Sequence, residues 1–301
     1  MVQRAVHYSR AAAALLASGH IAADTFKCPA WPDLLPTVLA AHSAYVHFAL
    51  KAGAGIGDAV DTETGQLADW GRVEALLEQT GTPFVNVHLS PTGADQPGMP
   101  IDTTDAHDVE HVTACLIRDV QAVVARFGAE RVIVENDHDN GGLHLRPAYL
   151  PGVINRVVAE TGCGFLLDLA HVRLAAHILG TDPQIYCATL PVAAIREVHV
   201  SGVQPFGERF VAMLEQGGVA PTVMQRHVGR LMDHLPMTET DWAFTAWALD
   251  HIRDGCWGQP WVVALEYGGV GPLWEAVTEA DVLAVQVPRL HALVGLALGN
   301  S

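Results

Sequence analysis

Eight short apolar segments alternate along the chain with stretches that are long enough to form helices. Each segment is rich in Val, Ile, Phe or Tyr and has about the length of one buried strand. Apolar strands separated by helix-length stretches are typical of repeated βα units around a parallel sheet. The predicted strands are Arg4–Ser9, Ala22–Cys28, Ala44–Leu50, Pro83–Leu89, Arg131–His138, Gly164–Ala170, Arg196–Gly202 and Trp261–Tyr267.

The stretches between these strands have the amphipathic pattern of helices that cover a barrel. Eight βα units need roughly 250 residues, and the chain has 301. We therefore predict an α/β protein with a single (β/α)8 TIM-barrel domain over residues 1–301. A long insertion, at about residues 203–260, separates strands seven and eight, and such insertions usually form lids or substrate walls. The predicted helices are Ala11–Ser18, Pro32–His42, Trp70–Gln79, Thr104–Phe127, Leu150–Thr161, Asp182–Ala193, Thr240–Arg253 and Glu279–Leu298.

Each of the last six apolar segments carries an ionisable residue at or near its C-terminal end. In a parallel barrel these ends converge on one mouth, so ligands far apart in the sequence can meet there. A single carboxylate at such a place often caps the next helix, and a single His is often a hydrogen-bonded structural residue. Six in succession favour a metal site, because burying so many ionisable groups is costly unless a cation compensates. The six predicted ligands are His47, His88, Glu135, Asp168, His199 and Glu266.

Further polar residues lie close to these strand ends. His171 follows Asp168 by three residues, so both side chains can face one cavity if a helix begins there. His234, in the long insertion, could close the site from above or belong to an ordinary loop. Asn136 would point away from Glu135 on an ideal strand and so act behind the ligands, and residues 137–139 are expected at the rim. Several other histidines fall in helical patterns and are expected at the surface: His107, His111, His177, His227 and His251.

The chain is strongly acidic, with 33 Asp and Glu against 17 Lys and Arg and a net charge of −16. This balance disfavours a nucleic acid or an anionic membrane as the main partner. The two lysines, Lys27 and Lys51, fall near the predicted C-terminal ends of strands. They could anchor an anion or a carboxylate, or they could lie there by chance.

The five cysteines are widely spread and form no CxxC pair, so we expect neither a disulfide framework nor a thiolate zinc site, and a reducing cytoplasm fits best. Ala11–Ala17 is interpreted as a barrel helix and not as a signal peptide. No apolar run approaches the roughly 20 residues of a membrane span. The glycines between Gly53 and Gly57 lack the spacing of a dinucleotide loop, and no GxSxG elbow is present.

A set of strand-end motifs is more specific together than any one of them alone. The motifs are VHFAL with His47, NVHLS with His88, VIVENDH with Glu135 and Asn136, GFLLDLAHV with Asp168 and His171, EVHVSG with His199, and ALEYGG with Glu266. This series resembles the multinuclear non-haem iron-dependent oxidases, the family that contains the methanobactin-forming oxidase. The resemblance covers nearly the whole barrel.

The resemblance implies a TIM barrel of the xylose isomerase-like superfamily that holds two or three iron ions and activates dioxygen. Known members modify cysteine side chains of ribosomally made peptides, commonly with a partner protein that recruits the precursor. The implied substrate is therefore a thiol-containing peptide or small molecule. Lys27, Asn136 and His171 would then be catalytic residues, and the ligands would be His47, His88, Glu135, Asp168, His199, His234 and Glu266.

Three features depart from the family pattern. His171 stands where the family has Asn, and the usual Asp-x-His of the insertion is an adjacent Asp233-His234 pair. Both departures bear on the third metal position. The segment Asp24–Pro32 also lacks the acidic second strand of the family, which suggests a divergent branch with another substrate.

Other functions fit parts of the same pattern. A sugar isomerase or epimerase of this superfamily would hold one manganese, cobalt or zinc ion with the residues of strands five to eight, and carboxylates would move protons. That enzyme does not need His47 and His88, so we place it second. A tri-zinc phosphodiesterase of the endonuclease type is disfavoured by the negative charge, and a barrel that only binds would not need so complete a ligand set.

Overall fold

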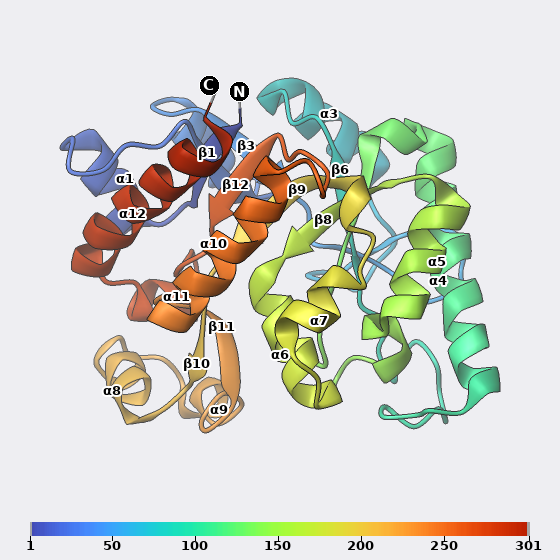
Figure 1. Ribbon diagram of the computed structural model, residues 1–301. Helices are drawn as coiled ribbons and strands as arrows, with labels where there is room; N and C mark the ends of the chain where they lie inside the picture. Colours follow the sequence, from blue (N-terminus) through green and yellow to red (C-terminus); the bar gives the residue numbers. More distant parts are fainter. Residues whose placement is uncertain (1, 300–301) are drawn as a thin grey trace.

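Parallel strands form a ring at the centre of the structure, and helices cover its outside (Figure 1). The computed structural model describes residues 2–299. Ten strands belong to one sheet in the order β3-β2-β1-β12-β9-β8-β7-β6-β4-β5, and the predicted TIM barrel is confirmed. The strands of this sheet are β1 Gln3–His7, β2 Thr25–Pro29, β3 Ala44–His47, β4 Leu50–Ala52, β5 Val60–Asp61, β6 Val85–Leu89, β7 Val132–Glu135, β8 Gly164–Asp168, β9 Ile195–Val200 and β12 Val262–Leu265.

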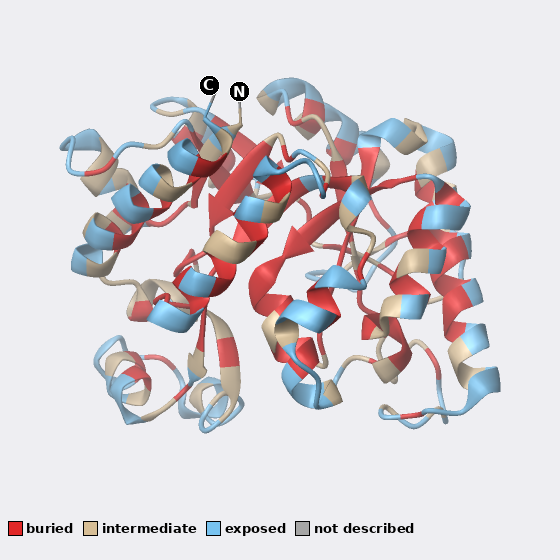
Figure 2. Ribbon diagram, viewed as in Figure 1, coloured by how far each residue is buried: buried red, intermediate tan, exposed pale blue. Residues whose placement is uncertain are grey.

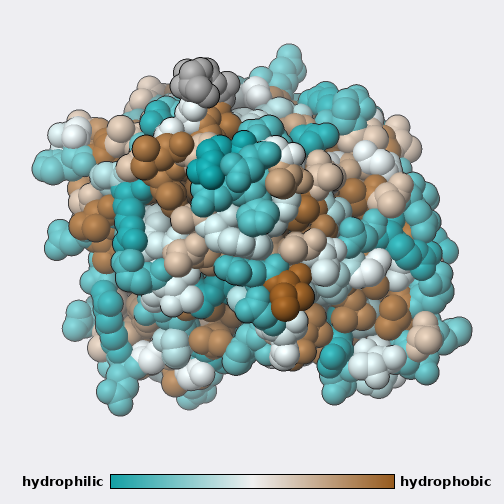
Figure 3. All heavy atoms as spheres, viewed as in Figure 1, coloured by the Kyte–Doolittle hydropathy of each residue, from teal (hydrophilic) through white to brown (hydrophobic). Residues whose placement is uncertain are grey.

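The helices lie between the strands with their apolar faces against the barrel. Figure 2 shows buried strands inside and exposed outer helix surfaces, and Figure 3 shows polar and apolar residues mixed over one face of the molecule. Side chains start several helices by accepting backbone N–H bonds, such as Asp105 before α4 and Thr238 before α10. The α-helices are α1 Arg10–Ala17, α2 Leu35–Leu39, α3 Trp70–Thr80, α4 Ala106–Phe127, α5 Pro151–Thr161, α6 Leu169–Leu179, α7 Pro183–Ala188, α8 Glu208–Gln216, α9 Pro221–Met224, α10 Glu239–Arg253, α11 Pro272–Val277 and α12 Ala280–Leu298.

The third barrel strand is interrupted, although one continuous strand was predicted over Ala44–Leu50. It consists of β3 and β4, and Phe48 and Ala49 lie between them. Asn86 of β6 spans the break: its Oδ1 accepts from Phe48 N at 2.7 Å, and its Nδ2 donates to Phe48 O at 2.9 Å. A side-chain amide therefore replaces a missing pair of backbone hydrogen bonds where the ring closes.

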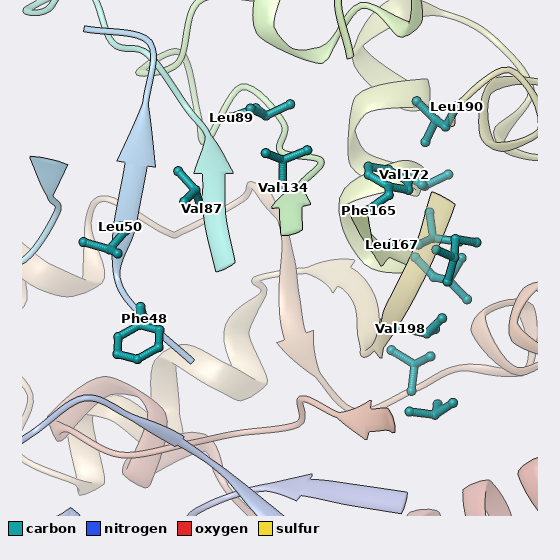
Figure 4. Packing of buried hydrophobic residues seen from close by; sticks show 14 of the residues in the cluster. Phe48, Leu50, Val87, Leu89, Val134, Phe165, Leu167, Val172, Leu190 and Val198 are labelled. Atoms are coloured by element: carbon teal, nitrogen blue, oxygen red, sulfur yellow. The ribbon is translucent and has the colours of Figure 1, made fainter. Parts of the chain in front are cut away.

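The outward faces of the strands carry the apolar residues that pack under the helices. Figure 4 shows Val87, Val134, Phe165 and Leu167 on neighbouring strands, with Val172 of α6 packed nearby. A separate, smaller cluster fills the lower interior of the barrel with Ala5, Tyr45, Val262 and Ala264. The alternation of side chains along a strand thus leaves the inward positions at the C-terminal ends free for polar residues.

The insertion between β9 and β12 contains a two-stranded antiparallel sheet of β10 (Gly202–Pro205) and β11 (Leu231–Leu235). α8 and α9 connect the two strands, and all four elements lie at the bottom of Figure 1, opposite both chain termini. A small apolar cluster that includes Phe206, Phe210 and Leu235 holds this unit together. The insertion stands at the barrel mouth and brings residues 233 and 234 over it.

Two helical regions differ from the prediction. The sixth strand ends at Asp168, and α6 begins at Leu169, whereas the sequence pattern placed the strand through Ala170 and the next helix at Asp182–Ala193. The predicted helix corresponds only to the short α7. The side chain of Asp168 explains the early start, because its Oδ1 accepts from His171 N at 2.8 Å and caps the helix.

One helix, α12, is long and apolar enough to cross a membrane by length and composition. In the structure it is the last helix of the barrel and packs against α10, α1 and β1. Its apolar character is therefore accounted for by its place in the fold, since one face of such a helix is buried against the barrel.

Candidate metal centre

Eight ionisable side chains form an inward-facing ring at the C-terminal ends of the barrel strands. Each barrel strand contributes one residue, which lies at an inward-facing position near the end of the strand or, for Glu266, directly after it. Strand pairing sets neighbours side by side, such as His88 beside Glu135 and Asp168 beside His199. The ring consists of His7, Lys27, His47, His88, Glu135, Asp168, His199 and Glu266.

The histidines are oriented by hydrogen bonds on the ring nitrogen that faces away from the centre. His88 Nδ1 donates to a backbone carbonyl of β4 at 2.9 Å, and His171 Nδ1 donates to Asn136 O at 2.8 Å. His199 Nε2 donates to the buried carboxylate of Glu197 at 2.7 Å. Because each of these nitrogens carries the proton, Nε2 of His88, Nε2 of His171 and Nδ1 of His199 are the nitrogens that can offer a lone pair to a metal.

Glu135 lies between two groups of histidines. Its Oε2 is 3.0 Å from His88 Nε2 and 3.4 Å from His47 Nε2. Its Oε1 is 3.7 Å from His199 Nδ1 and 3.7 Å from His171 Nδ1. A carboxylate in this position can bridge two metal ions, with Nε2 of His88 and His47 on one side and Nδ1 of His199 on the other. His171 Nδ1 donates to Asn136 O, so His171 could bind a metal only through Nε2.

A second group surrounds Glu266. His199 Nδ1 is 3.0 Å from Glu266 Oε1, and a ligand atom of Asp168 lies within 4.8 Å of both. The ammonium group of Lys27 forms an ion pair with the same Glu266 oxygen. Lys27 is thus a fixed positive charge inside the ring, next to three candidate ligands. Lys51 instead pairs with Asp95 at 2.5 Å and is absent from the residues that line the cavity, so the anion-anchor hypothesis has no structural support there.

The insertion adds ligands from above. Asp233 Oδ2 is 3.0 Å from His171 Nε2, and His234 Nε2 is 3.8 Å from Glu266 Oε2. His234 has a left-handed backbone with φ of 54°, and its N–H donates to Ser201 Oγ at 3.1 Å. The structure therefore brings His171 and His234 to the centre together with the six strand-end residues, and it adds Asp233.

The nitrogen and oxygen atoms of the ring are arranged to bind a metal ion and do not all satisfy one another by hydrogen bonds. His88 Nε2 and Glu135 Oε2 face each other, and unless a proton or a cation lies between them, two lone pairs meet. Glu135 Oε2, His199 Nδ1 and His234 Nδ1 are buried and have no hydrogen-bond partner within residues 2–299. Such orphaned acceptors are costly unless a cation binds them. Nitrogen and oxygen donors without thiolates suit iron, manganese or zinc.

Four overlapping groups of three side chains have ligand atoms within 4.8 Å of one another. They are His47, Glu135 and His199; Glu135, Asp168 and His171; Asp168, His199 and Glu266; and His138, His171 and Asp233. In the last group, His138 Nδ1 accepts from Asn140 N at 3.0 Å, so a neutral His138 carries its proton on Nε2 and acts as a donor. We therefore leave His138 out of the ligand set.

The pKa values of the ring residues indicate that, without a metal, protons on the histidines balance the charges of the neighbouring carboxylates. Burial lowers the pKa of His88 and His199, but the neighbouring carboxylates Glu135 and Glu266 outweigh burial and raise both above the usual value. Burial likewise raises the pKa of Glu135, which the charges of its histidines hold well below the usual range. Asp168 is the exception, because burial raises its pKa to about 6. Metal binding must displace these protons.

The ring opens into a cavity of about 520 Å³ at the barrel mouth. Residues from β1, β2, the loop after β7 and the insertion line it, and Trp274 of α11 contributes an aromatic wall. Asp168 and His199, which are 1% and 0% exposed, lie beneath its floor. The deepest candidate ligands are thus shielded from water, while the cavity leaves room for a substrate side chain beside the centre.

The remaining sequence predictions have mixed outcomes. Asn136, predicted as a catalytic residue, holds the backbone of Asp168: its Oδ1 accepts from Asp168 N at 2.9 Å and its Nδ2 donates to Asp168 O at 3.0 Å. His107, His111 and His177 are exposed as expected. The expectation for the other helical histidines was wrong, since both are half-buried; they are His227 and His251.

The sequence interpretation missed three residues near the site. His7 ends the first apolar segment and completes the ring, so the strand-end rule already contained the signal. Glu197 lies two residues before His199, and the alternation along a strand places it directly beneath that ligand. His144 gave no signal, because it lies in a loop after β7 whose path the pattern does not determine.

Known proteins resemble this chain in sequence. The family described as RiPP precursor modification enzyme MbnB/TglH/ChrH matches residues 55–235. A UPF0276 protein of Bordetella pertussis is 48% identical over 46 residues, which are 15% of this chain and 16% of that protein. A UPF0276 protein of Rhizorhabdus wittichii is 25% identical over 175 residues, 56% of this chain and 58% of that protein. The chain thus spans less than two thirds of these relatives.

The fold also resembles a solved structure. A crystal structure of D-psicose 3-epimerase, determined in the presence of D-fructose, covers 99% of this chain and 100% of its own, with a TM-score of 0.55 and 12% sequence identity. At this identity the likeness concerns the fold, a xylose isomerase-like barrel, and leaves the chemistry to the residues of the ring.

Proposed function

The chain belongs to the family of RiPP precursor modification enzymes described as MbnB/TglH/ChrH, and we propose that it is a metal-dependent oxidase. In this proposal two or three iron ions at the barrel mouth activate dioxygen, and the substrate is a cysteine-containing peptide or a small thiol. The observation that carries the proposal is that Glu135 has imidazole nitrogens near both of its oxygens, with Glu135 Oε2 and His199 Nδ1 buried and without a hydrogen-bond partner within residues 2–299. This arrangement suits two metal ions and exceeds what one ion needs.

His47 and His88 favour the oxidase over a sugar isomerase or epimerase. The epimerase-like barrel supports the alternative, in which Glu135, Asp168, His199 and Glu266 hold one divalent ion. That reaction leaves the two extra histidines without a role, although both lie within 3.4 Å of Glu135 Oε2. A second ion between these histidines and Glu135 accounts for them.

The bound iron would supply dioxygen activation and a positive site for a thiolate. The chain itself supplies the rest. Asn136 fixes the backbone of Asp168, Glu197 fixes the ring of His199, and Lys27 balances the charge of Glu266. The insertion places His234 near Glu266, and the deepest residues, Asp168 and His199, are buried, so charges there act in a medium of low dielectric constant.

The proposed partners follow from the family and the cavity. A peptide reaching the centre would insert one side chain into the 520 Å³ cavity, and a recruiting protein would hold the remainder of the peptide. The five cysteines are all free, four of them buried, and we place the protein in the cytoplasm.

Metal analysis tests the proposed function. The protein is purified without added metal, its metals are counted by plasma mass spectrometry, and an electron paramagnetic resonance spectrum is recorded. Two or three iron atoms per chain with a coupled mixed-valent signal, together with oxygen consumption in the presence of a thiol, are expected. One manganese, cobalt or zinc atom per chain with no iron signal would contradict the oxidase and support the isomerase.

A further inference from the structure

One wall of the cavity, the loop after β7, carries two lining residues that lie outside the metal groups. They are Asp137 and His144. Neither residue belongs to a metal-capable group of the described chain. Asp137 is 5% exposed, and the His144 side chain is 15% exposed, so a buried carboxylate stands behind an imidazole that the cavity can reach.

The orientation of the His144 ring is fixed on one nitrogen. Nδ1 donates to His138 O at 3.0 Å and lies 3.3 Å from Asp137 Oδ1. The proton of a neutral ring is therefore on Nδ1, and Nε2 offers its lone pair. Nε2 has no hydrogen-bond partner among the residues that the structure describes. An imidazole held in this way by a carboxylate is arranged as a general base.

The loop holds both groups in place. His144 forms an isolated antiparallel bridge with Thr92, and its N–H donates to Asp139 O at 3.0 Å. Leu145 N donates to Pro91 O at 2.9 Å. Asp137 Oδ1 accepts from His138 N at 2.6 Å. The dyad thus depends on backbone contacts with the neighbouring β6 loop.

The surroundings of the ring favour a proton on it. The ionisable groups that face His144 are Asp137 and His138 from its own loop and His88 from β6. Burial lowers the pKa of His144, and His88 also lowers it, but the charge and hydrogen bond of Asp137 outweigh both and raise the pKa. The ring is therefore a stronger base than a free imidazole.

We propose that His144 is a catalytic base that takes the proton of the substrate thiol, and that Asp137 is its positioning residue. The S–H bond breaks, its electron pair stays on sulfur, and an N–H bond forms on Nε2. Asp137 then stabilises the imidazolium. The inference rests on the proposed function, because it takes a thiol as the substrate of the same cavity.

Proton counting tests this step. 2-Mercaptoethanol is added to the metal-loaded protein in weak buffer at about pH 8.5. This pH is chosen about two units above the ordinary imidazole pKa of ~6.5, because the pKa of His144 is raised and the ring must start neutral. A pH indicator records released protons, and absorption of the bound thiolate records binding. In the wild type His144 keeps the proton, so we expect almost none released; in His144→Gln we expect about one per thiol bound. Asp137→Asn should release an intermediate number, because the base is weaker.

The controls separate the two proposals. Metal content is measured for every variant and should stay equal, and the exposed His177→Gln should behave as the wild type. If the wild type and His144→Gln bind the thiol and release equal numbers of protons, the dyad is overturned while the metal centre stands. If the wild type binds no metal or no thiol, the proposed function and the base inferred from it both fail.

Discussion

The carboxylate of Glu197 accepts a hydrogen bond from His199 Nε2 at 2.7 Å, one pleat beneath the ring of ionisable residues. The hydroxyl of Tyr45 and the indole N–H of Trp261 donate to the same carboxylate at 2.9 and 3.0 Å. Glu197 is therefore held from three sides and keeps a proton on His199 Nε2. This leaves Nδ1 of His199 free to face Glu266.

Replacing Glu197 by Gln should weaken metal binding by about 10–100-fold, the usual effect of losing a carboxylate behind a ligating histidine. The amide can accept only weakly from His199 and so no longer fixes the ring. Competition with a chelator, followed by the metal content of the protein, measures the affinity. Tyr45→Phe is the matched control, because it removes one donor to Glu197 and keeps the bond to His199. Equal metal affinities of Glu197→Gln and the wild type would contradict the role.

Lys27→Met should destabilise the metal-free protein by about 3 kcal/mol, because it removes one of the two close positive partners of the buried Glu266 and leaves only His199. A bound metal ion supplies another positive charge, so the loss should be smaller in the metal-loaded protein. Urea unfolding with and without a chelator measures both.

Lys51→Met is the control for this prediction. Lys51 forms an ion pair with Asp95 that is more exposed than the pair of Lys27 and Glu266, and it does not line the cavity. Its replacement should lower the free energy of unfolding by the same amount with and without metal. If Lys27→Met also lowers the free energy of unfolding equally in the metal-free and the metal-loaded protein, a metal does not take over the neutralisation of Glu266 from Lys27.

The sequence predicted the barrel and most of the ring because both depend on local patterns. Strands such as Val85–Leu89 alternate apolar and polar residues, and this period of two places His88 inward whatever the loops do. The early start of α6 was not predicted, since the apolar run Leu166–Val172 fits a strand and a buried helix equally well. Only the cap at Asp168 distinguishes them.

Contacts between distant loops could not be predicted. Asp233 reaches His171 because β10 and β11 pair across 25 intervening residues of helix and turn, and nothing in those residues alone fixes the path. The same holds for His144, whose position depends on its bridge to Thr92. The break in the third strand escaped notice for another reason: a side chain, Asn86, replaces the backbone ladder there.

Asp168 should make the metal-free protein less stable as the pH rises from about 4 to about 6. Its pKa is raised by burial from 3.8 to about 6, so between these values the folded protein binds more protons than the unfolded chain, and stability falls with rising pH. Asp168→Asn removes this contribution and keeps an acceptor for the helix cap.

The difference in unfolding free energy, Asp168→Asn minus wild type, should therefore increase with pH in chelator-treated protein, by on the order of 2 kcal/mol between about pH 4.5 and about pH 7. Urea unfolding at about pH 4.5 and about pH 7 measures the two differences. A constant difference would show that Asp168 has an ordinary pKa.

Asn86→Leu should destabilise the protein by about 2–5 kcal/mol, because Phe48 N and Phe48 O each lose a buried partner. The loss should also loosen His47, whose Nε2 lies 3.2 Å from Asn86 Nδ2, and lower the metal content. Asn86→Asp keeps the acceptor for Phe48 N but loses the donor to Phe48 O and adds a buried carboxylate, so its unfolding free energy should also lie below that of the wild type. If Asn86→Leu were as stable as the wild type, the barrel would close at β3 and β4 without the side-chain bridge.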